Sequence, residues 1–248
     1  MRIAITMIFL VMSCRLAASD CVILLHGLAR TSGSMEKLAK RLEDEKYLVA
    51  NIDYPSTEYP VERLTEIAVE DGLHDCQQNR PDKIHFVTHS LGGILVRYYL
   101  KHNRVENLGR VVMLGPPNHG SEVVDKLKKF PGFSFINGPA GLQLGTGNET
   151  IPNSLGKADF EVGIIAGTRS INLILSTMIT SENDGKVSLE SAHLEGETDF
   201  KTLPTTHTFM MLDDQVIDNV LSFLKEGRFL EDKPADHARA CNNAPIGC

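Results

Sequence analysis

The sequence predicts an α/β fold, with a mostly parallel sheet covered by helices on both faces. Short apolar runs alternate along the chain with segments in which apolar residues recur at helical spacing. The first apolar run, residues 21–25, is uninterrupted, as expected for a strand that is buried on both faces. The length of 248 residues, with 42% hydrophobic and 23% charged side chains, fits one globular domain. Strands and helices that alternate in this way usually build one parallel sheet.

The elements follow in order from the hydrophobic spacing. Pro60 stands at the start of the second helix, where the missing N–H of proline costs nothing. Asp213 opens the last helix, where negative charge is favourable. The expected strands cover residues 21–25, 47–52, 84–88, 110–114 and 160–166, and the expected helices cover about 35–42, 60–68, 91–100, 121–129 and 213–226.

Residues 118–156 differ from the rest of the chain. After a short helical piece they become rich in glycine, proline and asparagine, which predicts irregular backbone. The apolar residues Phe130, Phe133 and Phe135 argue against simple disorder. Because long irregular insertions in a domain are usually functional, we expect a functional role for this segment, which follows the strand that ends near Pro117.

The N-terminus predicts export. Residues 1–19 combine an early arginine, an apolar run over residues 3–13 and small residues near the end, which is typical of a secretory signal cleaved before Asp20. A secreted or periplasmic location follows. A buried first strand and a lipoprotein anchored through Cys14 are the alternatives. Residues 20–229 then form the folded domain, and residues 230–248 form a polar C-terminal tail.

Cysteine usage agrees with export, because an even number remains after cleavage. Of the three possible pairings, Cys21–Cys76 and Cys241–Cys248 are favoured. The first would tie the opening strand to the end of a helix, and the second would close a short loop in the tail. The alternative is four free thiols in a reducing compartment.

Charge and spacing exclude several other functions. A net charge of −7 without a basic stripe argues against a nucleic-acid partner. The histidines show no metal-ligand spacing, so we expect neither a metal nor a cofactor. The oligomeric state is not predicted by the sequence.

The most specific motif lies at residues 88–93, which read Thr-His-Ser-Leu-Gly-Gly. Here an apolar strand meets a helix at Ser90, with Gly92 two positions on. Such a junction is typical of a nucleophile elbow, which exposes the serine hydroxyl and points the first N–H groups of the helix at a developing negative charge. The sequence therefore predicts acyl-transfer chemistry at Ser90.

A serine hydroxyl needs a base, and the base needs an acid that orients it. In hydrolases with this elbow both partners follow the serine along the chain. His207, in a loop just before the last helix, is the expected base, with His193 as the alternative. Asp184, in an Asn-Asp-Gly turn, is the expected acid, with Asp159 and Asp199 as substitutes.

The oxyanion of the intermediate needs two backbone donors. The N–H of Leu91, directly after the nucleophile, is one, and the N–H of Leu28 is the second. Leu28 ends the motif His26-Gly27-Leu28, in which Gly27 lets the backbone pass close to a substrate. His89 completes the supporting motif as a structural residue beside Ser90.

These motifs, together with Pro-Asn-His-Gly-Ser at residues 117–121, resemble the bacterial secreted lipases and esterases of the α/β-hydrolase superfamily, in particular the triacylglycerol-lipase-like branch. The resemblance covers roughly residues 20–229. It implies an α/β-hydrolase fold, a catalytic triad of Ser90, Asp184 and His207, and an oxyanion hole of Leu28 and Leu91. It also implies that residues 118–156 are a cap or lid over an acyl pocket.

Two positions depart from the family pattern. Thr88 stands where glycine usually precedes the nucleophile by two residues, so the packing around the elbow differs. Phe209 stands where many such lipases carry an acidic calcium ligand, so the calcium site is not carried over.

The expected function is that of a serine carboxylic-ester hydrolase, a lipase or esterase, that works through an acyl-enzyme. Its expected partners are a small acyl ester or lipid, with transient contact to a lipid surface. An acyltransferase or a phospholipase with the same triad remains an alternative. So does a non-catalytic lipid-binding module, because a fold alone does not prove activity.

Overall fold

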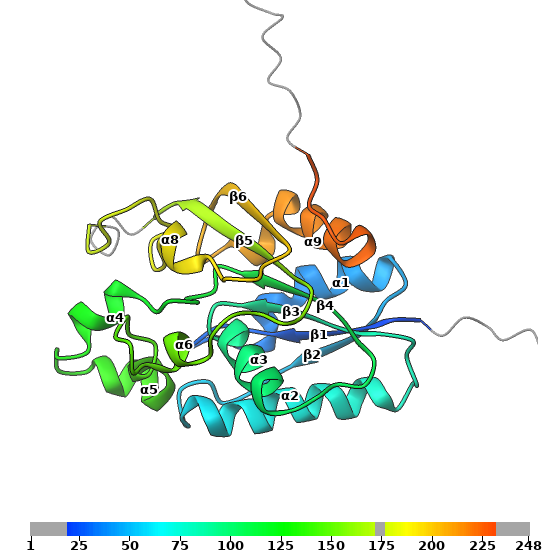
Figure 1. Cartoon of the computed structure of the whole chain (residues 1–248), viewed down its shortest axis with the longest axis horizontal. Helices are drawn as coiled ribbons and strands as arrows, with labels where there is room; N and C mark the ends of the chain where they lie inside the picture. Colours follow the sequence, from blue (N-terminus) through cyan, green and yellow to red (C-terminus); the bar gives the residue numbers. More distant parts are fainter. Residues whose placement is uncertain (1–18, 172–176, 232–248) are drawn as a thin grey trace, which may run out of the picture.

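The computed structural model describes residues 19–171 and 177–231 and contains one six-stranded parallel sheet (Figure 1). The strand order is β2-β1-β3-β4-β5-β6, and Cys21 at the start of β1 pairs with Leu48 on one side and Ile84 on the other. The predicted fold class is thereby confirmed. The strands are β1 (Cys21–Leu25), β2 (Leu48–Ile52), β3 (Ile84–His89), β4 (Leu108–Leu114), β5 (Val162–Arg169) and β6 (Asp199–Thr206).

Helices cover both faces of the sheet (Figure 1). Helices α2 (Val61–Gln77) and α3 (Leu91–His102) pack on one face, and α1 (Glu36–Asp44) and α9 (Asp214–Glu226) pack on the other. The shorter helical elements are η1 (Ser32–Met35), α4 (Glu122–Leu127), α5 (Phe133–Leu142), α6 (Ile151–Ser154), α8 (Leu189–Ala192) and η2 (Met210–Leu212).

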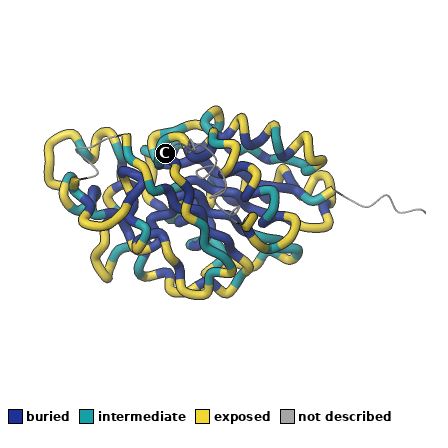
Figure 2. The backbone as a smooth tube through the Cα atoms, turned by 90° about the horizontal axis from the view of Figure 1, so that it is seen from above, coloured by how far each residue is buried: buried dark blue, intermediate teal, exposed yellow. Residues whose placement is uncertain are grey.

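The uninterrupted apolar sequence of β1 contributes side chains to two hydrophobic cores, one on each face of the sheet. Because side chains alternate across a strand, Ile23 and Leu25 pack in the core beside α2 and α3, whereas Leu24 packs in the core beside α1 and α9. Burying one such side chain contributes about 1.5–3 kcal/mol. Figure 2 shows the buried backbone concentrated in the centre of the molecule and surrounded by exposed segments.

Several elements differ from the expected pattern, among them the short helices α6 and α8, an additional helix in residues 133–142 and the last strand. Residues 133–142, expected to be irregular, form helix α5, which is kinked at Gly138 and continues through Pro139. Strand β6 was not expected, because it mixes polar residues with Pro204. It lies at the edge of the sheet, where the exposed Pro204 does not interrupt the hydrogen-bonded ladder. The edge position explains the weak apolar signal.

A disulfide joins Cys21 to Cys76 and so ties the start of β1 to the last turn of α2. This is the favoured first pairing. The described residues do not include Cys241, Cys248 or the alternative anchor residue Cys14. They also leave out residues 1–18 of the predicted signal segment and most of the polar tail. Within the described ranges, no helix is long and apolar enough to cross a membrane.

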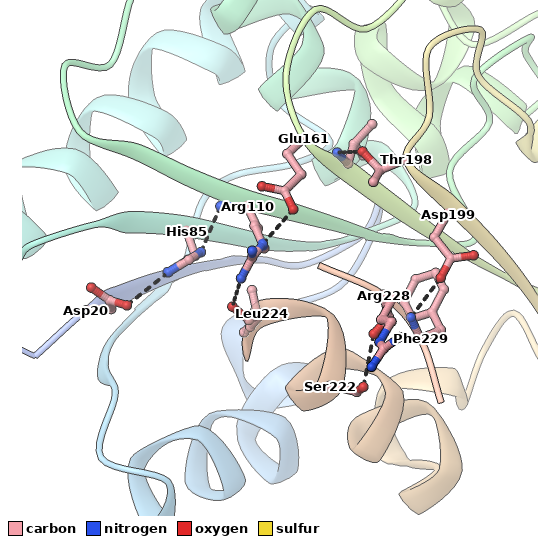
Figure 3. Close-up of polar contacts among 11 residues, drawn as sticks. Asp20, His85, Arg110, Glu161, Thr198, Asp199, Ser222, Leu224, Arg228 and Phe229 are labelled. Carbon is pink, nitrogen blue, oxygen red and sulfur yellow. Dashed lines mark hydrogen bonds and ion pairs between the residues drawn. The ribbon is translucent and has the colours of Figure 1, made fainter. Parts of the chain in front are cut away.

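A polar network holds the amino ends of the strands together (Figure 3). His85 Nδ1 accepts a hydrogen bond from the backbone N–H of Arg110 at 2.8 Å, and its Nε2 faces Asp20 Oδ2 at 3.4 Å. The Arg110 side chain donates to Glu161 Oε1 at 2.7 Å and to the carbonyl of Leu224 in α9 at 2.9 Å. Polar contacts therefore hold the amino ends of these strands together. The candidate site lies at the opposite, carboxyl ends.

The chain after α9 is fastened near the same region (Figure 3). The backbone N–H of Phe229 donates to Asp199 Oδ2 at 2.7 Å, and the Ser222 hydroxyl donates to the carbonyl of Arg228 at 3.0 Å. These bonds hold the end of α9 against the edge strand β6, whose far end carries His207.

Candidate active site

Ser90 occupies a sharp turn between β3 and α3. Its φ of 52° lies in the left-handed region, which is strained for a residue with a side chain. The turn is held by a hydrogen bond from the Ser90 N–H to the carbonyl of Leu114 at 2.9 Å. A Cβ atom on Gly92 would lie 2.7 Å from the carbonyl oxygen of Leu25, so only glycine lets α3 start this close to β1. Strain of this kind is characteristic of functional sites.

The structure brings Ser90, His207 and Asp184 together. His207 Nε2 lies 3.1 Å from Ser90 Oγ, and His207 Nδ1 lies 2.7 Å from Asp184 Oδ2. Both His207 and Asp184 are buried. His207 follows β6, Asp184 lies in the segment after β5, and Ser90 follows β3, so all three reach the carboxyl edge of the sheet. Ligands bind at this edge in open parallel sheets.

The second oxygen of Asp184 is also fixed. Asp184 Oδ1 accepts hydrogen bonds from the backbone N–H groups of Lys186 at 3.0 Å and Val187 at 2.9 Å. The carbonyl of Asp184 accepts from the N–H of His207 at 3.0 Å. With its carboxylate held in place, Asp184 keeps the proton of His207 on Nδ1, and the Nε2 lone pair faces the serine hydroxyl. Such an arrangement can remove a proton from Ser90.

The alternative partners lie elsewhere. His193 is exposed, pairs with Glu197 at 2.7 Å and stacks on Phe200. Asp199 accepts backbone hydrogen bonds at the amino end of β6, and Asp159 is exposed after α6. None of the three lines the cavity beside Ser90.

Leu28 and Leu91, the two residues expected to donate backbone N–H groups, both lie near Ser90. Leu91 is the first residue of α3, and Leu28 lines the same cavity as Ser90. The N-terminus of a helix carries partial positive charge, which favours a negative oxygen close to Leu91. A Cβ atom on Gly27 would lie 2.6 Å from His89 Nδ1, so glycine is required for the loop to pass this close to the elbow.

His26 fixes the loop that carries Leu28. Its Nδ1–H donates to the carbonyl of Gly27 at 2.9 Å, and its Nε2 accepts from the backbone N–H of Tyr54 at 3.3 Å. The rings of His26 and Tyr54 stack at 4.1 Å. Burial lowers the pKa of His26, which keeps the ring neutral and suits one donated and one accepted bond.

His89 contacts His207 directly. Its Nε2–H donates to the backbone carbonyl of His207 at 2.9 Å, and the two rings lie 4.8 Å apart. Burial, reinforced by the charge of neighbouring groups, holds the pKa of His89 well below its usual range. The sequence identified His89 only as a structural residue, and its position directly before Ser90 is the signal that ties it to the site.

A cavity of about 300 Å³ opens beside Ser90 and His207. The segment between β4 and β5, which contains α4, α5 and α6, forms one of its walls and lies at one end of the molecule (Figure 1). The apolar residues of this wall are Val123, Val124, Leu127, Phe133, Ile136 and Leu144. Arg30 and Lys186 also line the cavity, although no sequence motif had singled them out. The described part of the chain shows no group of three or more His, Cys, Asp or Glu side chains arranged to hold a metal ion.

No protein-family model and no curated protein sequence matches this chain. Among solved structures, it is similar to the mature form of lipase BlEst2 from Bacillus licheniformis, at 23% identity and a TM-score of 0.61, over 83% of this chain and 89% of the lipase. It is also similar to Aspergillus fumigatus lipase B, at 16% identity and a TM-score of 0.60, over 85% of this chain and 54% of that one.

A third similar structure is phospholipase PlaB from Legionella pneumophila, at 21% identity and a TM-score of 0.58, over 71% of this chain and 46% of that one. Together with the six-stranded parallel sheet, these similarities show that the chain has the α/β-hydrolase fold.

Proposed function

We propose that the protein is a serine carboxylic-ester hydrolase that works through an acyl-enzyme. The observation that carries this proposal is the chain of two hydrogen bonds from Ser90 through His207 to Asp184. Ser90 and His207 also line a largely apolar cavity. The structurally similar proteins named as lipases support the same class of reaction.

In the first step Ser90 Oγ attacks the ester carbonyl carbon, and His207 Nε2 takes the hydroxyl proton. The N–H groups of Leu28 and Leu91 stabilise the negative oxygen of the tetrahedral intermediate. When this intermediate collapses, the bond to the alcohol oxygen breaks and His207 returns its proton to the departing alcohol. Asp184 stabilises the charged imidazole during both transfers.

In the second step His207 takes a proton from water, and the resulting hydroxide attacks the acyl group on Ser90. The ester bond to Ser90 breaks, the carboxylic acid leaves, and the proton on His207 returns to Ser90 Oγ. Within the proposal, residues 118–156 act as the cap, because their apolar side chains form the wall against which an acyl chain packs. The exposed side chains Phe135 and Ile136 on α5 support transient contact with a lipid surface.

We also propose that the protein is exported after cleavage of the signal in residues 1–19. The Cys21–Cys76 disulfide supports this, because such bonds persist in oxidising compartments.

The test combines covalent labelling with kinetics on p-nitrophenyl esters of increasing chain length. We expect a fluorophosphonate to label Ser90, and Ser90→Ala or His207→Ala to lower kcat by about 10⁴-fold or more. The double variant should lose little beyond either single variant, because the residues act as a unit. His193→Ala, which removes an exposed histidine outside the cavity, is the matched control and should keep its activity. A folded protein that neither takes the label at Ser90 nor cleaves any of the esters contradicts the proposal.

A further inference from the structure

Two basic side chains line the cavity that contains the proposed nucleophile. Arg30 belongs to the loop after β1, and Lys186 lies two residues beyond Asp184. Lys186 keeps contact with solvent at the cavity mouth, but the surrounding protein and the nearby charge of Arg30 lower the pKa of its ammonium group. The two cations are therefore close enough to repel each other.

Asp184 attracts the ammonium group of Lys186, but neither cation forms an ion pair with a carboxylate among the residues that the structure describes. No ion pair or side-chain hydrogen bond is formed by Arg30 or Lys186 within that part of the chain. Asp184, the nearest carboxylate along the chain, is already held by His207 and by two backbone N–H groups. Asp53 and Glu58 line an adjoining hollow, but neither approaches Arg30 within ion-pair distance.

The positive charge of this cavity is opposite in sign to the net charge of the whole protein. The chain carries a net charge of −7, yet two unpaired cations converge on the one cavity that holds Ser90. Like charges brought together without a partner cost free energy, which an anionic ligand between them would recover. The cavity therefore has the electrostatics of an anion-binding site directly beside the reacting atoms.

The walls of the cavity are divided by chemistry. The apolar wall comes from the segment between β4 and β5, whereas the cations come from the loops that follow β1 and Asp184. An acyl chain fits the first wall and an anionic group fits the second. A phosphate suits a guanidinium and an ammonium together, because it offers several acceptor oxygens and up to about two charges.

We propose that the preferred substrate is an acyl ester whose alcohol part carries a phosphate group, and that Arg30 and Lys186 bind this phosphate. The inference rests on the proposed function, because it concerns the same reaction at Ser90. The proposed substrate class is therefore an acyl phosphoglycerol and not a neutral glyceride.

The test compares butyryl glycerol phosphate with monobutyrin, which have the same acyl chain and the same scissile bond. We expect kcat/KM to be about tenfold or more higher for the phosphate ester at low salt. This preference should shrink as the salt concentration rises, because exposed charges are screened. Arg30→Gln/Lys186→Gln should bring the ratio of the two kcat/KM values close to one, whereas Lys186→Arg, which keeps the charge, should preserve it.

The matched control removes two charges elsewhere. Arg104→Gln/Lys225→Gln takes one arginine and one lysine from exposed positions outside the cavity and should leave the ratio unchanged. Equal cleavage of the two esters by the unaltered protein overturns the inference, and so does a preference that survives loss of both cavity cations. A third outcome also overturns the inference: inorganic phosphate changes the rate of monobutyrin cleavage, but the protein shows no preference between the two esters. Arg30 and Lys186 would then form a site for a free anion and not for the substrate.

The same experiment separates this inference from the proposed function. If both esters are cleaved at equal rates and Ser90 takes the fluorophosphonate label, only the substrate class is wrong. If neither ester is cleaved and Ser90 stays unlabelled in folded protein, the proposed function itself is wrong and the inference falls with it.

Discussion

At the scale of single residues, the position of the His207 ring depends on the backbone that carries it. The Nε2–H of His89 holds the carbonyl of His207, and the side chain of Asp184 holds the ring. With the bond from the N–H of His207 to the carbonyl of Asp184, these contacts hold Nε2 at 3.1 Å from Ser90 Oγ. We therefore expect His89, which also lines the cavity, to act as a positioning residue through its contact with His207.

Replacing His89 with phenylalanine tests this role. The variant keeps a ring of similar shape but loses the donor to His207, so we expect kcat to fall about 10- to 100-fold with little change in KM. His89→Gln restores an N–H donor and should recover part of the loss. The measurement is kcat and KM on p-nitrophenyl butyrate, together with the rate of phosphonate labelling at Ser90. Wild-type kcat in a folded His89→Phe variant would contradict the assignment.

The residues that the sequence could predict are those with local signals. Ser90 stands at a strand–helix junction, and His207 and Asp184 follow it in the chain order of hydrolases. Lys186 and Arg97 carry no such signal, because a cation in a loop or on a helix looks like a solvated surface residue. Only the tertiary structure brings Lys186 to the cavity and buries Arg97.

At the scale of elements, Arg97 on α3 anchors both ends of the segment over residues 118–156. Its guanidinium donates to the carbonyl of Asn118 at 3.0 Å and to the carbonyl of Gly156 at 2.8 Å. It also donates to Asn118 Oδ1 at 3.1 Å, and the amide of Asn118 donates in turn to the carbonyl of Ala192. Burial lowers the pKa of Arg97 to about 10, which leaves it charged at neutral pH.

Arg97→Met should lower the free energy of unfolding by about 3 kcal/mol, because it leaves the buried acceptors of Asn118 and the part-buried carbonyl of Gly156 without their donor. Arg97→Lys keeps the charge but has a single donor group, so it should recover only part of the loss. Urea unfolding measures the difference. Lys40→Met, at an exposed position on α1 away from this segment, is the control and should cost less than about 1 kcal/mol. A change under about 1 kcal/mol in Arg97→Met would show that the segment is held in another way.

The elements also show where sequence patterns lose information. Strands β1, β3, β4 and β5 are buried on both faces, so their apolar runs predict them directly. Edge strand β6 carries polar residues, and α5 contains Gly138 and Pro139, which locally favour a turn. In α5 this glycine is required by packing, because a Cβ atom there would clash with the backbone of Thr57.

At the scale of the whole molecule, the two ends of the sheet have different tasks. The amino ends are joined by the network of Asp20, His85, Arg110 and Glu161 (Figure 3). The carboxyl ends carry Ser90 and His207, with a strained turn and unpaired cations nearby. The polar contacts at the amino ends contribute to stability, whereas the carboxyl ends carry the strained turn and the two cations.

Three buried histidines make this stability depend on pH. Burial is the largest cause that lowers the pKa of His26, His85 and His89 below the ordinary value of 6.5. In the unfolded chain these rings take up protons as the pH falls through about 6.5, whereas in the folded protein they take them up only at lower pH. The unfolded state then binds more protons, so stability is lost as the pH falls below that value. Each group contributes at most about 1.4 kcal/mol per pH unit.

We therefore expect the free energy of unfolding to fall by a few kcal/mol between pH 7.5 and 5.5, measured by urea unfolding at fixed ionic strength. His89→Gln removes the group whose pKa is lowered most and should make the dependence shallower. His102→Gln, which removes an exposed histidine on α3, is the matched control and should leave the dependence as steep as in the unaltered protein. The carboxylates with lowered pKa, Asp125 and Asp214, titrate below this window and add to the loss only in stronger acid. A free energy of unfolding that stays constant from pH 7.5 to 5.5 would mean that the buried rings are protonated as readily in the folded protein as in the unfolded chain. The assignment of His89 as a neutral ring that donates to the carbonyl of His207 would then be wrong.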